Sequence, residues 1–505
     1  MEDANGVTGT VDNGPAQLAG RGVKLPDELV GLSDKELGAL ELKLRKKIDL
    51  RLLPMIILIY IMNYLDRNNI ASARIAGPNG KGIQDELSLT SSQYQVGTTI
   101  SILFVGYLLM QVPSNLFLNK IGLPAVYLPT CMIVWGVISS ATAGVHSYGG
   151  LIAVRFFLGF VEAAFFPGAL FYLSSWYTRK ELGLRTALLY SGSLVSGAFS
   201  GLISAGITSG LDGVHGLRAW RWLFIIEGIV TITIAFISFF ILPNFPRTTT
   251  WLTPQERALA VWRLEEDIGV DDWTSSSAQS IWHGFALAVK DPKVYVLTLI
   301  LTGIVSAGSV TNFFPTVVQT LNFGTIQTLL LTTPPYVLAV ITSMANAWHA
   351  DRTGERFLHV VLPLCVGLAA FIIAACATST AARYVSMMLM VPGVYTGYVV
   401  CLAWISNSIP RPPAKRAAAL ALINAVSNAS SIWASYLYPQ SASPRYVMAF
   451  AVNCGTVGVA IIGAAVLRVM LMRLNRKLDR GNLVEGAVQA AGSEAAIQKG
   501  FRFLL

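Results

Sequence analysis

The sequence predicts an all-α integral membrane protein in which twelve transmembrane helices form two six-helix bundles. Of 505 residues, 53% are hydrophobic and only 13% are charged, whereas about 25% of residues are charged in a typical soluble domain. Apolar runs of membrane-spanning length recur along the chain, and one polar stretch, residues 244–291, divides them into two halves. Together these observations exclude a soluble fold.

The apolar runs have the length that a bilayer requires. A helix needs about 20 apolar residues to cross a hydrocarbon core of about 30 Å. We therefore expect one bundle over residues 51–243 and a second over residues 292–473. The runs centre near residues 61, 106, 134, 161, 197, 232, 305, 338, 367, 395, 426 and 457.

Residues 1–50 form a polar tail ahead of the first run. The tail has no apolar core followed by a small-residue cleavage site, which distinguishes it from a signal peptide. Ser33 and Glu36 have the spacing of a capping box and predict the start of a helix. The Leu-rich segment that follows, up to Leu44, is amphipathic, and we expect it to lie on the inner membrane surface.

Two further segments are polar: the predicted linker at residues 244–291 and a tail at residues 474–505. In the linker, Thr253 can cap a helix, Pro254 can occupy its first position, and Glu256 can reach back to the cap. A cytoplasmic helix should therefore begin at this point.

The net charge of +9 is distributed unevenly between the two sides of the predicted membrane. With an internal N-terminus, at least 23 Lys and Arg residues fall in inner segments and six in outer loops. This bias follows the positive-inside rule and predicts a multi-pass protein, expected in the plasma membrane, with both termini cytoplasmic. It accounts for the basic composition without nucleic acid as a partner. The six outer residues are Arg74, Lys81, Arg218, Arg221, Arg383 and Arg445.

A short repeat marks equivalent turns in the two halves. The turn after the second predicted helix matches the turn after the eighth in register, which favours two related bundles that rock against each other around a central site. We interpret both turns as gate turns. The residues concerned are Asn119, Lys120 and Gly122 in the first half, and Asp351, Arg352 and Gly354 in the second.

Four charged residues lie within predicted membrane helices: Asp66 and Arg67 in the first, and Arg155 and Glu162 in the fourth. A charge near the middle of a membrane helix costs about 2.5–3.5 kcal/mol, so such residues usually face a bundle interior or a wet cavity. Arginines can bind an anion and carboxylates can exchange protons. The alternative is that the four residues form ion pairs that lock the two helices together.

Arg155, Gly159 and Glu162 share one helix face, and the glycine leaves space between the charges. About 10 Å of helix rise separates Arg155 from Glu162, too far for a simple ion pair unless a third group joins them. We expect Asp66 to be that group. If a substrate anion occupied Arg155, protonation of Glu162 would become easier, and proton and substrate would bind together.

Other polar residues in the predicted helices have weaker assignments. Glu227 could belong to a proton path, or it could cap backbone groups and pair with Arg221. Four residues of the second half could hydrogen-bond or stack on a substrate, although polar residues also join membrane helices without touching one. These are Asn424, Asn428, Tyr395 and Tyr398.

Four segments together resemble the major facilitator superfamily, and within it the anion:cation symporters of the fungal allantoate permease type. They are YLDRNNI at 64–70, RFFLGFVEAAFFPG at 155–168, WRWLFIIEG at 220–228 and WLT at 251–253. The resemblance covers about residues 35–480 and implies twelve helices, alternating access and proton symport of small carboxylates. It also implies substrate roles for Arg67 and Arg155 and proton roles for Asp66 and Glu162. The acidic residue usual in the first gate turn is Asn119 here.

The predicted function is thus proton-coupled uptake of a small organic anion by a monomer. An exporter of a drug or secondary metabolite is the first alternative, although the proline typical of helix 5 in such antiporters is missing here. A nutrient sensor would usually need a longer cytoplasmic extension. The scattered histidines and the absence of CxxC spacing predict neither an enzyme, nor a metal site, nor a cofactor.

Overall fold

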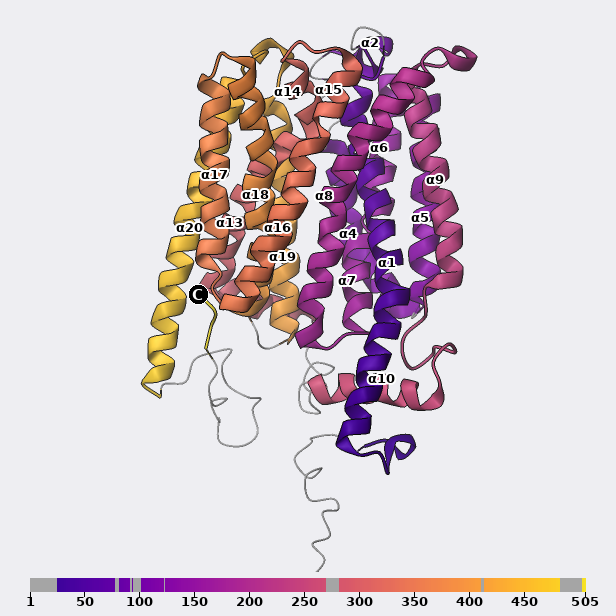
Figure 1. The fold of residues 1–505 in the computed structure, drawn as a ribbon, viewed down its shortest axis with the longest axis vertical. Coiled ribbons are helices and arrows are strands. Elements are labelled where there is room, and N and C mark those ends of the chain that lie inside the picture. The colour runs from indigo at the N-terminus through magenta and orange to yellow at the C-terminus, as the bar shows by residue number, and fades with distance from the viewer. Residues whose placement is uncertain are drawn as a thin grey trace, which may run out of the picture.

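The computed structural model describes residues 25–77, 81–90, 93, 101–121, 123–268, 281–409, 413–481 and 502–505. These residues form two groups of long helices that stand side by side (Figure 1). The first group contains α1 (Asp34–Ala73), α4 (Ser101–Ile121), α5 (Pro124–Ala141), α6 (Tyr148–Glu162), α7 (Phe165–Ser174), α8 (Arg179–Gly210) and α9 (Ala219–Ile241). The second contains α13 (Pro292–Gly308), α14 (Phe314–Gln319), α15 (Thr325–Leu331), α16 (Thr333–Thr353), α17 (Phe357–Cys376), α18 (Thr380–Ser408), α19 (Pro413–Ala434) and α20 (Val447–Asp479).

All twelve predicted centres fall within these helices. Ten helical stretches of the described chain are long and apolar enough to cross a membrane. The other two predicted spans correspond to α4 and α19, whose apolar stretches, Ile102–Gln111 and Ala418–Ala434, are shorter. The fourth span consists of α6 and α7, with a break just before Pro167, since proline disrupts the hydrogen bonding of a preceding turn.

The linker holds α10 (Pro254–Ile268) and α12 (Ile281–Lys290). Figure 1 shows α10 lying across the lower part of α1, beyond the bundles. We call this side of the molecule the linker end. The opposite side, where the short helix α2 (Ile83–Glu86) lies, is the α2 end.

The amphipathic segment of the tail is not a separate helix on a surface. It forms the first part of α1, which runs without interruption for 40 residues from Asp34 into the bundle. The capping box at Ser33 and Glu36 is present as predicted. Between Leu44 and Leu53 the chain is rich in Lys, Arg and Leu, all strong helix formers. The helix therefore continues across the predicted boundary at residue 50.

The predicted helix start in the linker is also confirmed. The Glu256 carboxylate accepts a hydrogen bond from the Thr253 backbone N–H at 3.0 Å, and the Glu256 N–H donates to Thr253 Oγ1 at 3.2 Å. The same carboxylate accepts a hydrogen bond from Lys47 Nζ of α1 at 2.7 Å. One glutamate thus caps α10 and ties it to α1.

Glu256→Gln is expected to loosen α10 by up to about 1 kcal/mol, because it removes the charge that pairs with Lys47. Burial opposes ionisation of Glu256, but hydrogen bonds from Lys47 and Thr253 outweigh it and hold the pKa of this carboxyl below its usual range. Such a group stabilises the fold above its ordinary pKa, and the contribution is lost as pH falls through the folded value. Protection of the α10 amides from hydrogen exchange, corrected for the intrinsic rate at each pH, should therefore fall in the wild type below about pH 4.5, whereas Glu256→Gln should show the lower protection already at neutral pH.

Arg257→Gln is the matched control, because Arg257 lies on the same helix and is exposed. It should leave exchange unchanged. Equal hydrogen exchange of α10 in Glu256→Gln and wild-type protein at neutral pH would show that the Glu256–Lys47 ion pair does not stabilise α10.

The bundles meet closely where α8 packs against α15 and α16. A Cβ on Gly201 would lie 2.3 Å from Thr332 Oγ1 and 2.6 Å from the Leu329 carbonyl oxygen. A Cβ on Gly197 would lie 2.3 Å from the ring of Tyr336. Gly197 and Gly201 of α8 therefore form a packing seam between the two halves, close to the α2 end.

Gly201→Ala is expected to force this seam apart and lower the free energy of unfolding by about 1–3 kcal/mol, the usual cost of overpacking. Gly206 lies on the same helix with no other atom within 4 Å of an added Cβ. Gly206→Ala should therefore be neutral or slightly stabilising, since alanine is the better helix former. The melting temperatures of the two purified variants in detergent measure the difference. Equal melting temperatures would exclude a tight seam at Gly201.

Candidate functional site

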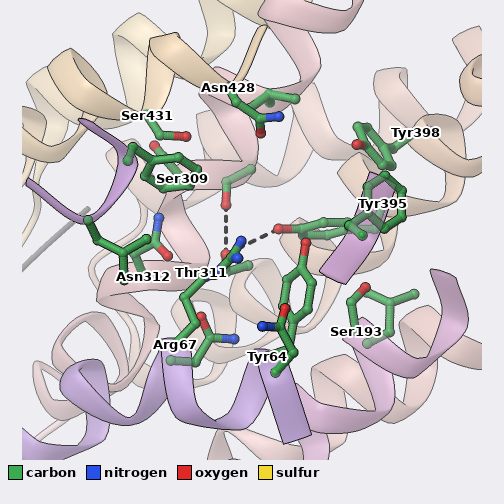
Figure 2. Close-up of a pocket in the computed structure, with 18 of the residues that line it drawn as sticks. Tyr64, Arg67, Ser193, Ser309, Thr311, Asn312, Tyr395, Tyr398, Asn428 and Ser431 are labelled. Carbon is green, nitrogen blue, oxygen red and sulfur yellow. Dashed lines mark hydrogen bonds between the residues drawn. The ribbon is translucent and has the colours of Figure 1, made fainter. Parts of the chain in front are cut away.

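A cavity of about 1250 Å³, counting space open to solvent, lies between the two bundles. Its walls come from α1, α4, α6 and α8 on one side and from α13, α18 and α19 on the other. Figure 2 shows Arg67 and Tyr64 pointing into it from one half, and Tyr395 and Asn428 from the other. All six residues predicted to bind substrate line this cavity: Arg67, Arg155, Asn424, Asn428, Tyr395 and Tyr398.

Arg67 forms the principal ion pair of the site with Glu162. Both Nε and Nη2 of Arg67 lie 3.0 Å from Glu162 Oε2, and Glu162 is fully buried. The guanidinium also lies over the rings of Tyr64 and Tyr107, at 5.2 and 5.0 Å from their centroids. Aromatic faces attract cations, so these rings help to hold Arg67 in place.

Arg155 lies beside this pair. Its side chain is almost fully buried, at 1% exposed, and its Nη2 donates to the Arg67 carbonyl oxygen at 3.2 Å. The space left by Gly159 is occupied by α4, since a Cβ there would lie 2.0 Å from the Leu103 carbonyl oxygen. The glycine therefore lets α4 approach α6 and does not simply separate two charges.

Asp66 lies on the other side of α1, away from the cavity. It accepts hydrogen bonds from Ser139 Oγ of α5 and Thr231 Oγ1 of α9, both at 2.7 Å. Neighbouring residues on a helix point about 100° apart, so Asp66 and Arg67 contact different walls. The expectation that Asp66 joins Arg155 and Glu162 is therefore wrong, and Arg67 takes that place.

Glu227 of α9 is also buried, at 2% exposed, and Asp66 and Asn69 lie close to it. Its two carboxylate oxygens accept no hydrogen bond from any residue that the structure describes. The alternative in which Glu227 pairs with Arg221 is excluded, because Arg221 binds Glu86 of α2 at 3.0 Å. Glu227 and Asp66 thus form a buried acidic pair behind α1.

The second half supplies neutral polar groups. Asn428 Nδ2 donates to Asn424 Oδ1 at 3.0 Å, and the hydroxyls of Tyr395 and Thr311 lie 3.2 Å apart. The rings of Tyr398 and Tyr190 lie 4.9 Å apart, one from each bundle. The cavity is therefore cationic on one wall and aromatic and amide-rich on the other.

Several lining residues were not predicted. Tyr60, Tyr64 and Arg67 have the spacing i, i+4, i+7 and share a face of α1, a pattern that could have pointed to the two tyrosines. The rest carry no spacing that distinguishes them from packing residues. The unpredicted polar and aromatic lining residues include Tyr60, Tyr64, Tyr107, Tyr190, Thr311, Asn312 and Ser431.

Of the two gate turns, the structure describes the second. Gly354 has φ of +70° and ends α16 with an N–H bond to the Ala350 carbonyl oxygen, a conformation that favours glycine. Asp351 pairs with Arg356 of its own bundle at 2.6 Å, and Arg352 lies over the Trp348 ring. The side chains of Asn119 and Lys120, and all of Gly122, lie outside the described residues. A gating role for either turn stays a prediction.

Comparison with known proteins places this architecture in a family. Residues 56–435 match the family model described as Major Facilitator Superfamily. The chain belongs to the Major Facilitator Superfamily. The protein is therefore a multi-pass membrane transporter and not an enzyme.

Among its relatives in the superfamily, the MFS-type transporter cnsO of Penicillium expansum is 33% identical over 460 residues, covering 88% of this chain and 86% of the relative. The MFS-type transporter efuF of Hormonema carpetanum is 30% identical and covers 90% of this chain and 89% of its own length.

Solved structures of the superfamily share the fold. A D-xylose-proton symporter superposes with a TM-score of 0.60 at 15% identity, covering 82% of this chain and 96% of its own. A bacterial homologue of the human lysosomal transporter Spinster, in an inward-facing and occupied conformation, gives 0.61 at 14% identity and covers 86% and 98%. At such identities the likeness shows the fold alone.

Proposed function

We propose that this superfamily member is a proton-coupled symporter that takes up a small organic anion, a carboxylate or vitamin-like acid, by alternating access. The observation that carries the proposal is the central cavity, where Arg67 and Arg155 face the other bundle and Glu162 is buried behind Arg67. The YLDRNNI and RFFLGFVEAAFFPG segments support the allantoate permease type of anion:cation symporter. We further propose a monomer in the plasma membrane with both termini cytoplasmic. The charge bias of the loops supports the position of the termini.

Charge balance in the first bundle favours joint binding of anion and proton. Two arginines and three carboxyl groups lie there within a predicted membrane region, and all except Arg67, whose side chain is 14% exposed, are buried: Arg67, Arg155, Asp66, Glu162 and Glu227. Net charge in a membrane interior is costly. An added anion is therefore best accommodated when one of the carboxylates gains a proton.

The Arg67–Glu162 pair provides the exchange. In our proposal, a substrate carboxylate takes Glu162's place on Arg67, with Arg155 as the second cation. Glu162, released from its cation inside a buried site, then accepts a proton, because an ionised carboxylate without a partner is costly in an apolar environment. Loss of the proton on the inner side re-forms the ion pair and expels the substrate. In this proposal, Arg67 couples substrate binding to protonation of Glu162, whereas the sequence analysis assigned that coupling to Arg155.

Asp66 and Glu227 are proposed as further proton carriers. Asp66 accepts hydrogen bonds from two hydroxyl groups, while Glu227 is buried beside it near the Asn69 amide and accepts no direct hydrogen bond from the described residues. A proton on one member of this pair would avoid two neighbouring negative charges. Since Asp66 and Arg67 are adjacent in α1, protonation of the Asp66–Glu227 pair can affect the position of Arg67 in the substrate site.

Uptake of labelled carboxylates into cells that express the protein tests the proposal. Uptake above that of control cells, faster at acidic than at neutral external pH and abolished by a protonophore, is the expected result. One pH unit supplies about 1.36 kcal/mol per proton. Export of a secondary metabolite with no uptake of any acid would overturn the direction, and it would favour the exporter.

A further inference from the structure

A second cavity lies between the bundles at the α2 end. Its empty volume is about 1280 Å³, a figure that includes open solvent, and both halves line it. The first half contributes Arg74, Lys81 and Gln84, and the second contributes Thr316, Asn322 and Arg383. We call it the α2-end cavity.

This cavity lies in line with the central one. Arg67 and Arg74 are spaced i, i+7, so they share a face of α1 about 10 Å apart. Arg67 lines the central cavity and Arg74 lines the α2-end cavity. In the second half, Asn312 lines the central cavity and Thr316, four residues later, lines the α2-end cavity. Arg74 Nη1 lies 3.5 Å from Thr316 Oγ1, so this contact crosses between the bundles.

The lining of the α2-end cavity is cationic. Arg74, Lys81 and Arg383 carry three positive charges, and Asp85 is the one acidic residue that lines it, among those that the structure describes. These three are half of the six basic residues in the predicted outer loops. Such a concentration of one sign of charge in a concave surface attracts anions.

The two arginines are held in fixed positions. Arg383 Nη2 donates to Thr320 Oγ1 at 2.6 Å and to the Pro444 carbonyl oxygen at 2.7 Å. Arg74 is 7% exposed, and its Nε donates to Gln84 Oε1 at 3.0 Å. Because these side chains are already ordered, they lose little conformational entropy when an anion binds.

We propose that the α2-end cavity is a second anion-binding site, which holds a small carboxylate from the outer solution before it reaches Arg67 and Arg155. The proposal rests on the proposed function for the orientation of the α2 end and for the anionic substrate. Its basis is the position of three cations in a cavity that both halves line, directly in line with the central site.

Binding of 4-fluorobenzoate to the full-length protein in detergent, measured by 19F line broadening, tests the proposal without transport. All variants carry Arg155→Gln, which weakens the central site. Residual broadening is expected in this background, and adding Lys81→Gln with Arg383→Gln should raise the dissociation constant about 25-fold, or roughly fivefold for each charge removed. Lys81 is exposed, so Lys81→Gln alone, with a fivefold rise, tests the site even if the Arg383 variant fails to fold.

Arg218→Gln is the matched control, because Arg218 is exposed at the same end and does not line the cavity. It should leave binding unchanged. Loss of all broadening on Arg155→Gln alone, or equal effects of Lys81→Gln and Arg218→Gln, would overturn the α2-end site. Neither result bears on the central site, whose failure would appear as absent uptake in the carboxylate panel.

Discussion

Arg155→Gln is expected to lower kcat/KM for carboxylate uptake by about 100-fold or more, since losing one buried charged contact costs about 2–5 kcal/mol. Glutamine can still donate a hydrogen bond to the Arg67 carbonyl oxygen, which Arg155 Nη2 contacts at 3.2 Å. The substitution therefore removes the charge and keeps much of the local packing. Initial uptake rates over a range of substrate concentrations, corrected for the amount of protein in the membrane, measure the effect.

Two comparisons separate charge from geometry at this position. Arg155→Lys keeps the charge but lacks the planar fork that binds a carboxylate through two hydrogen bonds, so an intermediate loss is expected. Arg257→Gln removes an exposed charge from α10 and should have no effect. Uptake by Arg155→Gln equal to that of Arg155→Lys would mean that the charge of Arg155 does not bind substrate.

Glu162→Gln is expected to abolish proton-driven accumulation while leaving substrate exchange intact. The neutral amide cannot carry a proton, and it cannot compete with a substrate carboxylate for the Arg67 guanidinium, which lies 3.0 Å from Glu162 Oε2. Substrate affinity should therefore hold or rise. The pH dependence, up to tenfold per pH unit for one proton, should disappear. Uptake at a series of external pH values, together with counterflow of preloaded substrate, measures both properties.

Glu256→Gln is the control for this variant, because it also neutralises a glutamate that forms an ion pair. Glu256 lies in the linker, outside the central cavity, and its partner is Lys47 at 2.7 Å. It should keep the pH dependence. Persistent accumulation against a gradient in Glu162→Gln would assign the coupling to another carboxyl, and Asp66 and Glu227 would be the next to replace.

The helical fold follows from the sequence because a bilayer leaves the chain few options. Every apolar run of about 20 residues must satisfy its own backbone hydrogen bonds, and a helix does so alone. Charges within those runs pointed to Arg67 and Arg155, since a buried charge without a role is unfavourable. The structure indeed places both in the central cavity.

Pairing within the site could not be predicted, because it depends on how helices rotate and approach one another. Arg67 and Glu162 meet because α1 turns Asp66 toward Ser139 and Thr231. Trp220 shows the same limit at the α2 end. Trp220 is fully buried and donates to Glu86 Oε2 at 2.5 Å, a contact between α9 and α2 that no residue spacing predicts.

The order of Asp66 and Arg67 along α1 decides which neighbouring helices each of them contacts. Asp66 hydrogen-bonds to α5 and α9, while Arg67 binds Glu162 of α6. Exchanging the two would preserve composition, length and net charge, yet it would direct a guanidinium at two hydroxyls and set a carboxylate against Glu162. A variant with Asp66 and Arg67 exchanged would thus keep the composition of this protein but lose transport.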